Sequence, residues 1–183
     1  MNISDIIKRH VRNTPDKTAV IFGERRITYA QLDALINRTA DGLLKTGLKR
    51  GDVLSLFLPS IPELIISYLG TARAGITVNV VNAMLREQEV VYILKDCQSR
   101  AIIVDKARRP IIEAVKPELK SLEMVMVHND AENKSYASLE SILDQGSEDF
   151  KPVGTKGSDV CHLMYTSGTP FRGRQAFKTA FAG

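Results

Sequence analysis

The regular alternation of apolar runs with helical patterns is the feature that most constrains the fold of this chain. Five short runs rich in Val, Ile, Leu, Met and Phe lie at residues 53–58, 76–81, 101–104, 124–127 and 160–165. Between most of them, apolar residues recur at helical spacing. Strands joined by helices in this way are most simply parallel, with right-handed crossovers and helices on both faces. The sequence therefore predicts a three-layer α/β fold around a mostly parallel sheet.

The first 50 residues add a helix, a small hairpin and a second helix to this scheme. Residues 3–11 have an amphipathic pattern, and residues 19–22 and 26–29 are β-type runs around Gly23. A helical stripe at residues 32–44 ends at Gly47, which favours a helix C-terminus. We expect residues 1–169 to form one α/β unit and residues 170–183 to be a separate basic tail.

The positive charge of the chain is concentrated in that tail. The net charge is +4, and residues 170–183 hold Arg172, Arg174 and Lys178 but no acidic residue. The body is therefore close to neutral, and its basic pairs, such as Arg25 with Arg26, are isolated and interrupted by acids. This pattern predicts a mixed, solvated surface and disfavours nucleic acid as a partner.

Cysteine usage and hydropathy indicate the compartment. Cys97 and Cys161 lack metal-ligand or redox spacing and lie in apolar elements, so two buried free thiols are expected. The N-terminus has no apolar signal segment, and Arg73 interrupts the longest apolar stretch. We expect a cytoplasmic protein with no membrane span.

The last apolar run opens into Thr166, Ser167, Gly168 and Thr169. At the carboxyl edge of a sheet, such hydroxyls and backbone N–H groups suit phosphate oxygens. From composition alone, an ordinary turn is the better explanation of the same residues. Neither a Walker loop nor a dinucleotide-binding glycine fingerprint occurs. We find no metal-ligand spacing and nominate no nucleophile or general base.

Three segments, in order, carry a resemblance to a known family. Residues 163–169 read Leu-Met-Tyr-Thr-Ser-Gly-Thr, residues 27–32 read Ile-Thr-Tyr-Ala-Gln-Leu, and residues 69–79 read Leu-Gly-Thr-Ala-Arg-Ala-Gly-Ile-Thr-Val-Asn. Together they resemble the AMP-forming adenylating enzymes, a family that includes the acyl-CoA synthetases. The resemblance implies the N-terminal part of that family's large domain, with Thr166, Ser167, Gly168 and Thr169 over the β- and γ-phosphates of ATP. It also implies Mg2+, CoA and a carboxylic acid, and the run at 78–82 resembles fatty-acid-CoA ligases of the long-chain type.

The resemblance stops where the phosphate motif should continue. The family pattern goes on Thr-Gly-x-Pro-Lys-Gly, whereas this chain has Pro170, then Phe171 to Gly173, and Arg174 in place of the lysine. Proline lacks an N–H donor, and a planar guanidinium is no close substitute for an ammonium group. The later adenine-binding segments and the domain with the catalytic lysine have no counterpart. We therefore expect a truncated region that is inactive alone, with a tail outside the family pattern.

Two further expectations complete the sequence analysis. An alternative to the truncated ligase is a non-catalytic α/β domain that binds a nucleotide or a partner with part of the phosphate loop. In either case, surfaces normally covered by later sequence, together with an open edge on the last strand, predict self-association.

Overall fold

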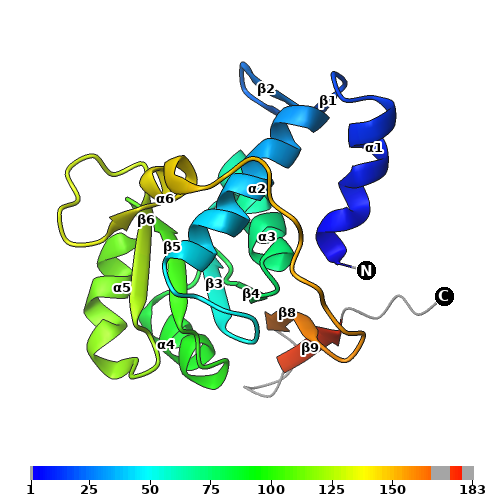
Figure 1. The fold of residues 1–183 in the computed structure, drawn as a ribbon. Coiled ribbons are helices and arrows are strands. Elements are labelled where there is room, and N and C mark those ends of the chain that lie inside the picture. Colours follow the sequence, from blue (N-terminus) through cyan, green and yellow to red (C-terminus); the bar gives the residue numbers. More distant parts are fainter. Residues whose placement is uncertain (1, 166–173, 179–183) are drawn as a thin grey trace.

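Within residues 2–165 and 174–178, which the computed structural model describes, the chain forms a seven-stranded sheet with helices on both faces (Figure 1). The sheet strands are β3 (Val53–Phe57), β4 (Thr77–Val80), β5 (Ala101–Asp105), β6 (Met124–His128), β7 (Ala137–Ser138), β8 (Val160–Tyr165) and β9 (Arg174–Lys178). The helices are α1 (Lys8–Asn13), α2 (Tyr29–Lys45), α3 (Pro62–Arg73), α4 (Glu87–Asp96), α5 (Arg109–Val115) and α6 (Leu139–Gln145), with 3₁₀ turns η1 (Ile3–Ile7) and η2 (Lys116–Glu118).

The strand order is β7-β6-β5-β3-β4-β8-β9. All described neighbours pair in parallel except β8 and β9, which are antiparallel. The buried strands β3 and β5 are nearly continuous apolar runs, as expected for strands covered on both faces. The three-layer α/β prediction is confirmed.

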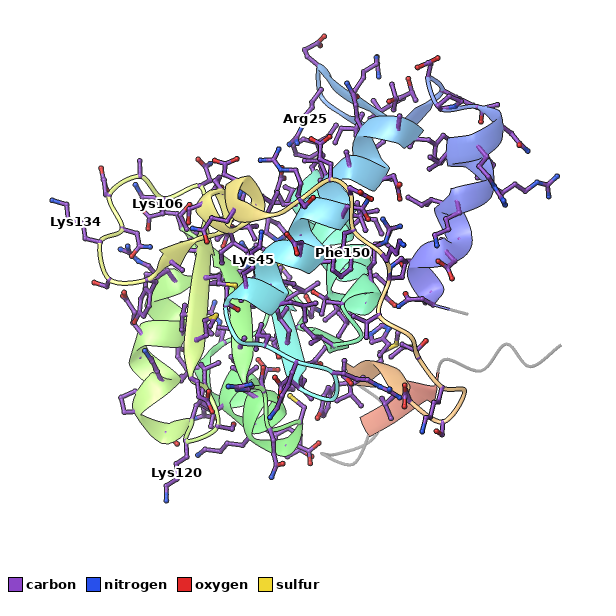
Figure 2. The ribbon with its side chains drawn as sticks, viewed as in Figure 1. Arg25, Lys45, Lys106, Lys120, Lys134 and Phe150 are labelled. Atoms are coloured by element: carbon purple, nitrogen blue, oxygen red, sulfur yellow. The ribbon has the colours of Figure 1, made fainter. Side chains whose placement is uncertain are left out.

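Two cores separate the helices between the faces. One core joins α2, α3 and α6 to one face, where Leu54, Leu56, Val78, Ile103 and Met126 are buried. The other joins α4 and α5 to the opposite face through Phe57, Ile102, Val104, Val125 and Val127. The connection from α6 to β8 crosses the first face, and Phe150 packs against that core (Figure 2).

The N-terminal segments form a small lobe on α2 and α3. The antiparallel hairpin of β1 (Thr18–Phe22) and β2 (Arg25–Thr28) shares a third core with η1 and α1. Thr28 caps α2 reciprocally with Gln31, which fixes the point where the hairpin becomes a helix. Arg73 is 1% exposed and pairs with Asp33 at 2.7 Å while donating to Ser4, so it ties η1 to both helices.

The structure corrects one expectation and adds one strand. The added strand is β7, two residues before α6 that the sequence pattern does not predict. In addition, β8 does not end the sheet, because residues 174–178 of the basic tail pair with it as β9. The expected open edge on the last apolar run is therefore wrong. No helix in the described part of the chain is long and apolar enough to span a bilayer.

Candidate functional site

The carboxyl ends of β3, β4 and β8 meet at one edge of the sheet. Leu56 lies in register with Val80, and Asn79 lies in register with Leu163. From this edge the chain enters α3 on one face after β3 and α4 on the other face after β4. Connections that leave adjacent strands toward opposite faces create the crevice in which open α/β sheets bind ligands. This edge is the candidate site.

An open apolar groove lies along α3 at this edge. It has a volume of about 330 Å³ and is lined by Ser60, Ile61, Leu64, Ile65, Tyr68 and Val80. We call it the α3 groove. Pro62 begins α3 beside it, where a missing N–H costs nothing, and Glu63 lies in the first turn. The groove can therefore accept an apolar group next to the end of β4.

A tyrosine–histidine pair joins α3 to β8 next to the groove. The hydroxyl of Tyr68 lies 3.1 Å from Nδ1 of His162, and the two rings meet edge to face at 5.4 Å. Burial raises the pKa of the Tyr68 phenol and lowers the pKa of the His162 imidazole. Both groups are consequently neutral at pH 7. His162 is thus packed against Tyr68.

On the opposite face, α4 holds the end of β8. The Tyr165 hydroxyl donates to the Asp96 carboxylate at 2.5 Å, and the rings of Tyr165 and Tyr92 meet edge to face at 6.5 Å. Tyr165 is the last described residue of β8. Its ring therefore has a fixed position at the point where the chain leaves the carboxyl edge.

The residues predicted to hold phosphate follow directly. Thr166, Ser167, Gly168 and Thr169 lie outside the described residues. Tyr165, the residue that precedes them in the sequence, is described and ends β8 at the carboxyl edge.

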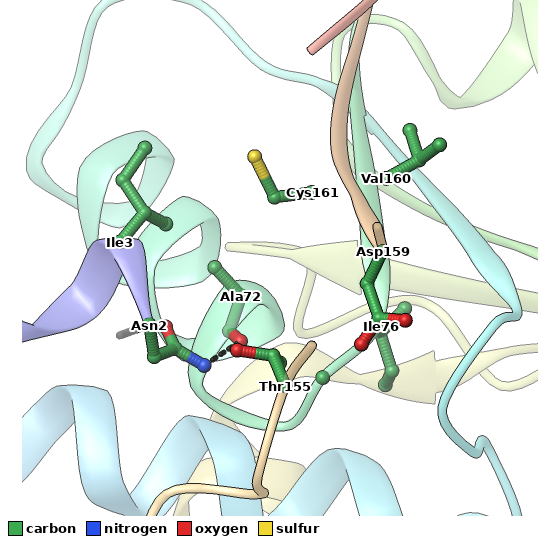
Figure 3. Close-up of a pocket in the computed structure, with 9 residues that line it drawn as sticks. Asn2, Ile3, Ala72, Ile76, Thr155, Asp159, Val160 and Cys161 are labelled. Atoms are coloured by element: carbon green, nitrogen blue, oxygen red, sulfur yellow. Dashed lines mark hydrogen bonds between the residues drawn. The ribbon is translucent and has the colours of Figure 1, made fainter. Parts of the chain in front are cut away.

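Cys161 lies at the other end of β8, against a very small cavity (Figure 3). The cavity has a volume of about 10 Å³, and its lining includes Asn2, Ala72 and Cys161. This is room for about one water molecule. Burial raises the pKa of the Cys161 thiol, so the thiolate needed for nucleophilic attack is disfavoured. Both cysteines are buried thiols that are not joined in a disulfide, as expected from the sequence.

Charged side chains at the ends of β5 and β6 are paired with one another. Arg108 pairs with Asp105 at 2.7 Å, and His128 lies 2.6 Å from Glu140. Among the described residues, no group of three or more His, Cys, Asp and Glu side chains is arranged to hold a metal ion. These pairs stabilise the loops that follow β5 and β6.

The two contacts that hold β8 cannot be predicted from the sequence. Tyr68 lies in α3 and Tyr92 in α4, and nothing in their spacing indicates contact with residues more than 70 positions later. The helical pattern around Tyr68 identifies a buried face of α3 without identifying the partner of that face.

The chain matches a family model described as "AMP-binding enzyme" over residues 7–170. Among curated proteins, it is 31% identical over 175 residues to a 3-hydroxybenzoate–CoA/4-hydroxybenzoate–CoA ligase of Thauera aromatica, covering 94% of this chain and 34% of that protein. It is 33% identical over 144 residues to the long-chain-fatty-acid–CoA ligase FadD13 of Mycobacterium tuberculosis, covering 79% of this chain and 28% of that protein.

Solved structures of CoA ligases are also similar to this chain. The anthranilate CoA ligase AuaEII in complex with anthranoyl-AMP superposes with a TM-score of 0.90 at 26% identity, over 97% of this chain and 34% of that one. The N-terminal domain of FACL13 from Mycobacterium tuberculosis gives a TM-score of 0.84 at 28% identity, over 96% and 43%. The chain thus spans about a third of the length of the curated relatives it matches.

Proposed function

This chain belongs to the AMP-binding enzyme family, and on that premise we propose that it is the phosphate-binding N-terminal region of an AMP-forming carboxylate–CoA ligase. The observation that carries the proposal is the family match over residues 7–170, which extends from the N-terminal lobe through β8 and the residues that follow it. The fold agrees, because the carboxyl edge of β8 is a position where α/β sheets bind ligands.

We assign phosphate binding to Thr166, Ser167, Gly168 and Thr169. Their three hydroxyls and their backbone N–H groups are donors that suit the β- and γ-phosphate oxygens. Such donors support the transition state by holding charge on the leaving phosphates, and none of them needs to act as a nucleophile. Tyr165, fixed by Asp96, would position the start of this segment.

ATP fits this donor set through its phosphates and, when bound, supplies the adenylyl group that activates a carboxylate. CoA would be the acceptor in the second half-reaction. Mg2+ is implied by the family, and among the described residues no group of three or more His, Cys, Asp and Glu side chains is arranged to hold it. We therefore derive no step through the metal.

We further propose a fatty acid of the long-chain class as the substrate of the complete ligase. The 33% identity to FadD13 supports this class, while the similar identity to a hydroxybenzoate ligase makes aromatic acids the alternative. The run at 78–82 supports it only through resemblance, because Asn79 is fully buried and donates to Ser55 at 2.8 Å. Asn79 therefore packs inside the fold and cannot touch an acyl group.

The 183-residue chain by itself is proposed to be inactive. The experiment is ATP–pyrophosphate exchange with long-chain, medium-chain and aromatic carboxylic acids, with FadD13 as the positive control. We expect exchange from FadD13 and none above background from this chain. Exchange that depends on any one acid would show that the 183 residues suffice and would identify the substrate.

We also propose that the chain associates with itself through the α3 groove. Ile65 on the groove and Met164 on β8 are each 39% exposed, and Met164 lies one position beyond the β4–β8 register pair of Asn79 and Leu163. Because β9 covers the edge of β8, the groove is a better candidate than the strand edge.

A further inference from the structure

The tip of the β1–β2 hairpin combines exposed apolar side chains with arginines. Ile21 is 65% exposed and pairs across the hairpin with Arg26, while Phe22 is 49% exposed and pairs with Arg25. Because successive side chains of a strand point to opposite faces, the tip presents one apolar residue and one arginine on each face. Large exposed apolar residues next to each other are unusual on a protein surface.

The tip is rigidly held although it lies outside the core. At its base, Ile27 is 4% exposed and packs in the third core with Val20, and Gly23 turns the chain with a φ of 55°. The tip projects from the end of α2, far from β6 and the loop that follows it (Figure 1). The tip therefore protrudes from the fold, and its exposed side chains can contact a partner without any unfolding of the chain.

The surroundings of the tip are positively charged. Between residues 2 and 28 the exposed cations are Arg9, Arg12, Lys17, Arg25 and Arg26, whereas the exposed acids are Asp16 and Glu24. Arg25 pairs with Glu63 on α3. No ion pair joins Arg26 or Lys17 to a carboxylate in the part of the chain that the structure describes. Their charges are therefore available to an anionic partner.

We propose that the hairpin tip docks on an anionic lipid surface, with Ile21 and Phe22 in the interfacial region and the basic residues near the headgroups. Apolar groups that protrude on both faces of a thin ribbon suit insertion into a layer, and flanking cations are attracted to anionic lipid. A nucleic acid would match the cations but leave the two apolar side chains unused. The inference does not rest on the proposed ligase function.

The test is co-sedimentation of the 183-residue chain with sucrose-loaded vesicles. One set contains equal parts of phosphatidylcholine and phosphatidylglycerol, and the other contains phosphatidylcholine alone. We expect binding to the anionic set that weakens with salt and little binding to the neutral set. No binding to anionic vesicles, or equal binding to both sets, would overturn the proposal.

Matched variants locate the surface. Arg26→Gln should weaken vesicle binding roughly fivefold, and joint Ile21→Ser and Phe22→Ser by roughly tenfold or more. The controls are Lys134→Gln and Met84→Ser, which change an exposed cation and an 82% exposed apolar residue elsewhere; Lys134 lies well away from Arg25 (Figure 2). If the controls weaken binding as much as the tip variants, the hairpin is not the docking surface. Unchanged circular dichroism excludes misfolding as the cause.

Discussion

The hydroxyl of Tyr165 lies 2.5 Å from a carboxylate oxygen of Asp96, which links the end of β8 to the crossover helix between β4 and β5. Tyr165, the residue before the predicted phosphate segment, is thus held by α4 through Asp96, which lies 69 positions earlier in the sequence. The position of Tyr165 therefore depends on α4 as well as on β8 itself.

Removing this hydroxyl should destabilise the fold modestly. For Tyr165→Phe we expect a loss of about 1 kcal/mol in the free energy of unfolding, because the hydrogen bond to a charged partner is partly exposed. Urea denaturation measures it, and Tyr29→Phe is the matched control, since the Tyr29 ring stacks on His10. Asp96→Asn combined with Tyr165→Phe should cost little more than either change alone. Fully additive losses would show that the two groups do not interact.

Gly70 allows α2 and α3 to approach each other closely. A Cβ atom at this position would lie 2.5 Å from Cβ and Cγ2 of Thr39. Gly70→Ala should therefore force the helices apart and cost about 1–3 kcal/mol in urea denaturation, despite the better helix propensity of alanine. Gly154→Ala, where nothing lies within 4 Å, is the control and should change stability little. Equal effects at both positions would contradict the close packing.

His162 should make stability depend on pH between 7 and 5. Burial lowers the pKa of its imidazole in the folded chain, so below about 6.5 the unfolded chain binds a proton that the folded chain resists. Stability should fall with pH in this window by at most about 1.4 kcal/mol per unit. Carboxylates with a lowered pKa, such as Asp41 and Glu140, lose their contributions at lower pH.

Replacing His162 isolates its contribution to the pH dependence of stability. His162→Gln should flatten the pH dependence of stability between 7 and 5 relative to the unmodified chain. Thermal or urea denaturation at each pH provides the measurement. Identical slopes for His162→Gln and the unmodified chain would show that the imidazole titrates as it does in water.

Sedimentation velocity at micromolar concentration tests self-association. We expect a concentration-dependent species larger than the monomer, because the α3 groove leaves apolar side chains uncovered. Ile65→Lys should shift the chain toward monomer, and Met84→Lys, which is away from the groove, should not. A single monomeric species at all concentrations would refute this proposal.

Local sequence patterns are sufficient to predict the layers of the fold but not every pair of neighbouring strands. The runs at 53–58 and 101–104 are nearly all apolar, which predicts burial on both faces, and they form β3 and β5. The pairing of β8 with β9 could not be predicted, because residues 174–178 lie in a basic tail with no strand-like alternation. The backbone hydrogen bonds to β8 hold these residues as a strand, and such bonds cannot be predicted from the composition of the tail.

At the candidate site too, local features can be predicted from the sequence and long-range contacts cannot. The hydroxyl-rich segment after β8 was recognisable because its residue types and its family resemblance are both local. The contacts of Tyr68 with His162 and of Tyr165 with Asp96 depend on how α3 and α4 lie on the two faces of the sheet. Sequence spacing within one element carries no information about such distances.

We propose that residues 166–169, which follow β8 in the sequence, bind the β- and γ-phosphates of ATP. Calorimetric titration of the 183-residue chain with ATP and with AMP, both in the presence of Mg2+, tests it most directly. We predict binding of ATP at millimolar concentration, AMP binding weaker by roughly tenfold or more, and loss of this preference in Ser167→Ala. No heat from millimolar ATP, or equal affinity for ATP and AMP, would contradict the account.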